Sequence, residues 1–120
     1  MWRAHPLLGI GGGNYELELP LVGVSSVKTH ANSLYLQNLA EGGIVLEAAT
    51  LALIVVTLVA LARRRDRLLA LGVLAGTAAL ALHQCVDDLI FYPKVGLLAS
   101  LLIGAALGAS NGSEDGRQIP

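Results

Sequence analysis

The chain has 120 residues, of which 54% are hydrophobic and only 14% are charged, and its formal net charge at pH 7 is −1. This composition is too apolar for a typical soluble domain of this length, so it predicts an integral membrane protein. The near-neutral charge excludes the basic surface of a nucleic-acid-binding protein, and the single cysteine excludes an intrachain disulfide.

Residues 1–43 form the first region, which we expect to be a loop on the outer side of a membrane. The His5-Pro6 pair and the glycines that follow it predict turning backbone rather than a helix. These glycines lack the spacing of a dinucleotide-binding fingerprint, so a flexible loop is favoured over a phosphate site. Residues 16–27 mix acids, Pro20 and serines with Leu and Val, which suits an irregular loop with at most a short strand.

A short helix is expected near the end of this region. Asn32 or Ser33 can cap its first turn, because both side chains accept hydrogen bonds from backbone amides. Gly42 and Gly43 then predict a stop or a kink before the apolar segment that follows. This helix would lie at the membrane surface.

Apolar segments follow at residues 44–62, 68–86 and 92–110. Each has about 19 residues, which as a helix cover roughly 28 Å, close to the hydrocarbon thickness of a bilayer. The sequence therefore predicts an all-α, polytopic membrane protein with about three transmembrane helices after the outer-side loop. Residues 111–120 are polar and are expected to form a disordered cytoplasmic tail.

Glycine pairs and one proline stand out within these apolar segments. Gly72 with Gly76, and Gly104 with Gly108, have the small-xxx-small spacing that lets helices approach closely in lipid. They predict helix packing along those faces. Pro93 is expected in the first turn of the last helix, where its missing amide hydrogen has no intrahelical partner to lose.

A block of arginines separates the first two apolar segments and consists of Arg63, Arg64, Arg65 and Arg67. Short loops rich in Lys and Arg stay in the cytoplasm, so this block is expected inside and the residues around His30 and Asp87 outside. A site for anionic lipid or nucleotide phosphate at the arginines is a less favoured alternative.

His30 is the first candidate for chemistry, since a dense run of hydrogen-bonding side chains follows it at the membrane boundary. The run consists of Asn32, Ser33, Tyr35 and Gln37. An unperturbed histidine titrates near about pH 6.5 and can take a proton from a hydroxyl as a general base. A carboxylate orients such a base, so we expect His30 to approach Asp87 or Asp88. The competing interpretation is a solvated loop histidine.

The outer side also holds the cations Arg3, Lys28 and Lys94, which are candidates for holding an anionic group. Zinc binding by the three histidines is not favoured, because their spacing matches no local ligand pattern.

Three stretches together resemble the C-terminal part of the O-antigen ligase/polymerase family of bacterial membrane glycosyltransferases. They are AHPLLGIGGGNY at 4–15, THANSLYLQ at 29–37 followed by EGG at 41–43, and VDDLIFYPKVG at 86–96. The order and spacing of the stretches carry the resemblance, which extends to about residue 110. In the family the outer loop ends in a His-Asn-x-x-Leu-Gln run. Here Asn32 and Ser33 occupy its first two positions, and His30 lies two residues earlier.

The resemblance implies a multi-pass protein of the bacterial plasma (inner) membrane. Such a protein transfers a glycan from undecaprenyl diphosphate to an acceptor hydroxyl during synthesis of lipopolysaccharide or another surface polysaccharide, without a metal, another cofactor or a nucleotide sugar. The catalytic residues implied are His30, Asp87 and Asp88. The implied substrate-binding residues are Lys28, Asn32, Tyr35, Gln37 and Lys94.

Members of this family carry further helices and diphosphate-binding arginines upstream, so the chain resembles their last third and is expected to be inactive alone. Its expected partners are membrane lipid and the undecaprenyl-linked glycan, with another membrane chain as a further candidate and no nucleic acid. The alternative is a small three-span structural or assembly subunit without catalysis. An adjoining upstream reading frame with more spans would favour the first interpretation.

Overall fold

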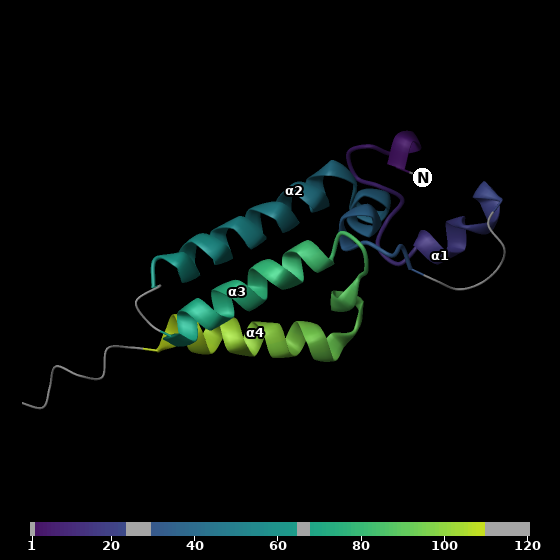
Figure 1. Cartoon of the computed structure of the whole chain (residues 1–120). Helices are drawn as coiled ribbons and strands as arrows, with labels where there is room; N and C mark the ends of the chain where they lie inside the picture. The colour runs from purple at the N-terminus through teal and green to yellow at the C-terminus, as the bar shows by residue number, and fades with distance from the viewer. Residues whose placement is uncertain (1, 24–29, 65–67, 110–120) are drawn as a thin grey trace, which may run out of the picture.

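A computed structural model describes residues 2–23, 30–64 and 68–109 of the chain (Figure 1). Within these ranges the protein is helical and contains no strand, which confirms the all-α fold class. The elements in order are η1 (Trp2–Ala4), α1 (Tyr15–Glu18), η2 (Pro20–Val22), α2 (Leu34–Ala62), α3 (Leu68–His83), η3 (Leu89–Phe91) and α4 (Pro93–Gly108). The expected tail at 111–120 lies outside the described residues.

The long helices α2, α3 and α4 lie side by side, and successive helices run in opposite directions (Figure 1). Helix α2 has 29 residues and is long and apolar enough to cross a membrane, whereas α3 and α4 are apolar but shorter, with 16 residues each. Pro93 begins α4 as expected. Helix α3 ends at His83, three residues before its predicted end, because the Val86 amide donates to the His83 carbonyl oxygen and closes a tight turn (2.9 Å).

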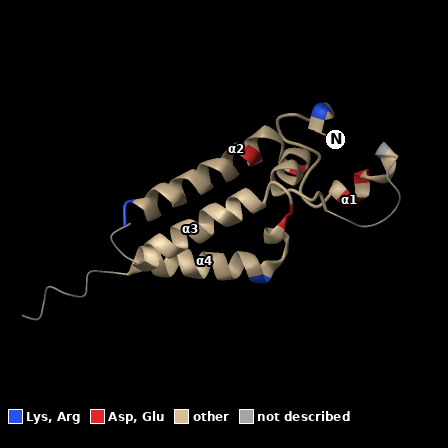
Figure 2. Ribbon diagram, in the orientation of Figure 1, with Lys and Arg blue, Asp and Glu red and all other residues tan. Residues whose placement is uncertain are grey.

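Charged residues lie at the two ends of the helical bundle (Figure 2). Between Glu47 and Arg63, α2 carries no charge, and neither does α3 nor the part of α4 after Lys94. Several large apolar residues on these helices are 62–89% exposed, namely Leu53, Val56, Leu68, Leu97 and Leu101. The core helix of a soluble domain buries such side chains, so this surface suits a lipid environment instead.

The bundle is most tightly packed where α2 ends, α3 begins and α4 ends, which we call the Arg64 end. Leu61, Ala70 and Ala106 meet there and are at most 1% exposed. The Arg64 guanidinium donates hydrogen bonds to the carbonyl oxygens of Leu107 and Ala109. It thereby satisfies carbonyl groups at the C-terminus of α4, where a cation also interacts favourably with the helix dipole.

Helix α2 is broken at Gly43, whose φ of 64° and ψ of −161° are not helical. The expected kink is therefore confirmed. The N-terminal residues 6–11 run past the break and form four backbone hydrogen bonds with its two sides. These are Ile10 N to Ala40 O (3.0 Å), Gly11 N to Glu41 O (2.8 Å), Ile44 N to Pro6 O (2.9 Å) and Val45 N to Leu7 O (3.3 Å).

Residues 16–23, predicted to be irregular with at most a short strand, form the end of α1 and the short helix η2 instead. The prediction of a short strand is therefore wrong for this part; residues 24–27 lie outside the described residues. Asn14 and Pro20 account for the difference, because Asn14 precedes α1 and the ring of Pro20 suits the first turn of η2.

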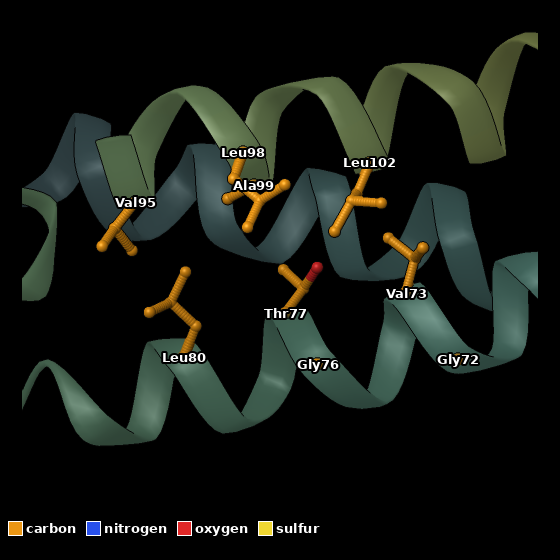
Figure 3. A pocket seen from close by; sticks show the side chains of 9 residues that line it. All are labelled: Gly72, Val73, Gly76, Thr77, Leu80, Val95, Leu98, Ala99 and Leu102. Carbon is orange, nitrogen blue, oxygen red and sulfur yellow. The ribbon is translucent and has the colours of Figure 1, made fainter. Parts of the chain in front are cut away.

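The glycine pairs do not pack against another described helix. A Cβ atom built at Gly72, Gly76, Gly104 or Gly108 meets no atom within 4 Å. The predicted packing along these faces is thus not found within the described residues, because the alanines of the Arg64 end make the close contacts instead. Gly72 and Gly76 line an apolar groove of about 260 Å³ between α3 and α4 (Figure 3).

Candidate functional site

His30 and Asp87 meet at the opposite end of the bundle, which we call the His30 end. His30 Nε2 lies 3.9 Å from Asp87 Oδ1. The imidazole stacks on the Phe91 ring with a centroid separation of 4.4 Å and an interplanar angle of 8°. The His30 side chain is 18% exposed and that of Asp87 is 42% exposed, while the His30 Nε2 atom itself is buried. The expected approach of His30 to Asp87 is confirmed.

The loop between α3 and α4 positions both Asp87 and Phe91. Asp87 Oδ1 accepts a hydrogen bond from the Asp88 amide (2.9 Å). Asp88 is 3% exposed, and its Oδ1 accepts from the Phe91 amide (3.0 Å), which caps η3. Asp88 therefore holds the turn that presents the Phe91 ring to His30. Its catalytic role stays a prediction.

The start of α2 fixes the backbone directly after His30. Ser33 is the N-cap, and its Oγ accepts from the Leu36 amide (3.5 Å), so the expected cap is confirmed. Gln37 reaches back along the chain, where its Oε1 accepts from the Ala31 amide (2.8 Å) and its Nε2 donates to Glu41 Oε1 (2.8 Å). Gln37 thus satisfies the Ala31 amide next to His30 and joins that part of the chain to α2.

Hydrogen bonds also attach α2 to the end of α3. The Tyr35 hydroxyl donates to the Ala81 carbonyl oxygen (2.6 Å), and the Leu34 amide donates to the Gln84 carbonyl oxygen (3.1 Å). Ala81 lies in the last turn of α3, where carbonyl groups lack an amide partner in the helix. Tyr35 supplies that partner, so Tyr35 and Gln37 both hold the site in place. Their predicted substrate-binding role stays a prediction.

The remaining predicted substrate-binding residues lie around this centre. Asn32 is exposed just before the N-cap, and Lys94 is exposed on the first turn of α4. Lys28 lies outside the described residues. Among the described residues the site thus contains the contacting pair His30 and Asp87, three residues with hydrogen-bonding roles in the fold (Tyr35, Gln37 and Asp88), and two exposed polar side chains (Asn32 and Lys94).

Two residues of the site were not assigned a role from the sequence. Phe91 forms the surface on which His30 stacks, and Gln84 is 1% exposed while its Oε1 accepts from the Leu89 amide (3.0 Å). Burying an amide without a partner is costly, so a lone glutamine at the end of an apolar helix indicates a buried hydrogen bond; Gln84 forms one through Oε1, while its Nε2 is buried without a hydrogen bond to any described residue. The buried hydrogen bond of Gln84 could therefore have been expected from the sequence. An exposed aromatic residue gives no comparable indication of its stacking partner.

The arrangement suits proton transfer. The Asp87 carboxylate beside the histidine can orient the imidazole, and the stacked Phe91 ring restricts its rotation. At 3.9 Å the two side chains are close together but lie beyond hydrogen-bond distance. Among the described residues, no group of three or more His, Cys, Asp and Glu side chains is placed to hold a metal ion. The chain matches no protein-family model, no curated protein and no solved structure.

Proposed function

We propose that the chain is a segment or short relative of a bacterial inner-membrane glycosyltransferase of the O-antigen ligase/polymerase family, with His30 as its general base. The observation that carries the proposal is the contact of His30 Nε2 with Asp87 Oδ1 beside the stacked Phe91 ring. His30 takes the proton of an acceptor hydroxyl while the hydroxyl oxygen attacks the sugar. The bond from the sugar to the diphosphate breaks, and undecaprenyl diphosphate leaves.

The proposal includes three membrane spans. The apolar part of α2 after the break, α3 and α4 share two common ends, and the charges lie at those ends (Figure 2). At 1.5 Å per residue, α3 and α4 each cover about 24 Å, and the turns beyond them add to this length. In this orientation the Arg64 end faces the cytoplasm and the His30 end faces the outer side, where lipid-linked glycans are transferred.

A non-catalytic structural or assembly subunit is the second candidate. It is favoured by the hydrogen bonds of Tyr35, Gln37 and Asp88, all of which join groups within this chain. The unpacked glycine faces of α3 and α4 would then contact the helices of another membrane protein. This candidate predicts that His30 contributes to stability and makes no contribution to turnover.

Glycan transfer in membranes separates the two candidates. We expect no transfer by the chain alone, because held geometry provides roughly 7–11 kcal/mol of a transferase's barrier reduction, and the described cations Arg3 and Lys94 are both exposed. The chain is therefore also tested as the C-terminal segment of a longer protein of the family. There His30→Ala should lower turnover by about 10²–10⁴-fold, the usual contribution of a general base.

The control is His5→Ala, which removes an exposed imidazole from the N-terminal region. It should leave turnover unchanged. If His30→Ala transfers glycan as fast as the parent, His30 is not the base and the structural candidate is supported. Rapid transfer by the isolated chain would show that the expected upstream helices are not needed.

A further inference from the structure

The break in α2 replaces helical hydrogen bonds with bonds to another segment. In a continuous helix, the amides of Ile44 and Val45 would donate to the carbonyl oxygens of Ala40 and Glu41. In the structure all four of these groups bond to residues 6–11 instead. Two bonds of a straight helix are thus exchanged for four bonds to the N-terminal segment, so the Ala40 and Glu41 carbonyl groups and the Ile44 and Val45 amides all keep a partner.

Two glycines make this arrangement possible. The φ and ψ of Gly43, 64° and −161°, lie in a region that is essentially restricted to glycine. A Cβ atom at Gly43 would also collide with the backbone of Leu7. Gly9 has a φ of 64°, and a Cβ atom there would collide with the backbone of Glu41. Both glycines therefore fit the broken form, while a continuous helix would accept a side chain at position 43.

The N-terminal segment is held by backbone bonds rather than by burial. Leu7 is 64% exposed and Leu8 is 72% exposed, so the segment places little apolar surface against α2. The glycines at 9, 11, 12 and 13 lose more conformational entropy on ordering than other residues do. The segment is therefore bound without a large apolar contact that would prevent its release.

A second contact depends on the break. Asn38 Nδ2 donates to Thr50 Oγ1 at 3.0 Å, although the two residues are 12 positions apart in α2. In a continuous helix they would be separated by roughly 18 Å along the axis, too far for a hydrogen bond. The part of α2 before Gly43 therefore folds back toward the part after it. This fold-back also sets where the residues around His30 lie.

We propose that residues 6–11 form a clasp that holds α2 in its broken form, and that release of the clasp converts residues 34–62 into one continuous helix. In the released form the Ile44 and Val45 amides take the Ala40 and Glu41 carbonyl oxygens as partners. The start of α2 then moves away from α3. The clasp is thus a conformational device that determines whether the His30 end is assembled, and the proposal does not depend on the proposed chemistry.

A distance measurement within α2 tests the clasp. Nitroxide labels are attached after Leu36→Cys and Leu53→Cys, two exposed positions on either side of the break, with Cys85→Ser to remove the native thiol. The distance between the two labels is measured by double electron–electron resonance on the full chain in phosphatidylcholine vesicles. About 17 residues of continuous helix span roughly 25 Å. The parent protein should give a clearly shorter distance.

Gly9→Ala and Gly43→Ala should each shift the distance toward roughly 25 Å. Gly9→Ala acts only on the clasp, while Gly43→Ala also favours the continuous helix because alanine has the higher helix propensity. Gly12→Ala and Gly76→Ala are matched controls, since a Cβ atom at either position meets nothing within 4 Å. Both controls should keep the parent distance.

The helix content of every variant is measured by circular dichroism alongside the distance. A released clasp leaves α2 continuous, so helix content should stay equal or rise. The proposal is overturned if the parent already shows a distance of roughly 25 Å, or if either glycine variant folds and keeps the parent distance. Loss of helix in both variants overturns it too, because the clasp would then be needed for α2 to form at all.

Discussion

The two ends of the helical bundle are held together by different interactions. At the Arg64 end, side chains from α2, α3 and α4 pack with almost no exposed surface. At the His30 end, the helices are joined mainly by hydrogen bonds to backbone groups. These run from the Tyr35 hydroxyl to the Ala81 carbonyl oxygen, from the Leu34 amide to the Gln84 carbonyl oxygen, and from the Leu89 amide to Gln84 Oε1.

The difference agrees with what associates helices in lipid, the environment proposed for this bundle. Burial of apolar surface contributes little there, because lipid is as apolar as the helix surface. Close packing and hydrogen bonds remain, and close packing dominates at the Arg64 end while hydrogen bonds dominate at the His30 end. The Arg64 end packs Leu61 against the small side chains of Ala70 and Ala106. The His30 end carries polar groups at its surface, which is where an acceptor hydroxyl would approach His30.

Breaking the packed end should have the largest effect on stability. Leu61→Ala removes a side chain that is 0% exposed, so the surrounding helices lose contacts and a cavity remains. We expect a loss of about 2–5 kcal/mol in the free energy of unfolding. Titration with denaturing detergent, followed by circular dichroism, measures it. Leu53→Ala is the control, because Leu53 is 68% exposed on the same helix; an equal loss in both variants would contradict a packed Arg64 end.

Breaking the hydrogen-bonded end should have a smaller effect. Tyr35→Phe removes the hydroxyl that satisfies the Ala81 carbonyl group and leaves the ring in place. The expected loss is about 0.5–1.5 kcal/mol, the usual net contribution of one hydrogen bond. The same detergent titration measures it, with Tyr92→Phe as the exposed control. A Tyr35→Phe protein as stable as the parent would mean that other contacts hold the His30 end.

The smallest loss of stability is expected when the charge of Arg64 is removed from the packed end. Arg64→Met keeps an unbranched apolar side chain but removes the donor to the α4 carbonyl groups. We expect a loss of about 0.3–1 kcal/mol, the range for a cation at a helix C-terminus. Arg63→Met is the control, because Arg63 is exposed and has the same charge. Thermal unfolding at low and high salt measures the difference, which should persist in salt because Arg64 also donates hydrogen bonds.

Much of the fold was predictable from the sequence because it depends on residues that are close together along the chain. The Ser33 cap, the kink at Gly43 and Pro93 at the start of α4 each follow from the conformational preferences of one or two residues. The approach of His30 to Asp87 was also predictable, since alternating helices place both segments at one end of a bundle. These features need only local chemistry and the order of the apolar segments.

Other features were decided by the tertiary structure alone. The glycine pairs predicted packing, yet Ala70 and Ala106 make the close contacts, because the rotation of each helix about its axis selects the buried face. Likewise, no pattern in the sequence matches residues 6–11 to the break more than 30 positions away. Hydrogen bonds between distant backbone groups carry no side-chain signature, so only the folded chain determines which carbonyl group meets which amide.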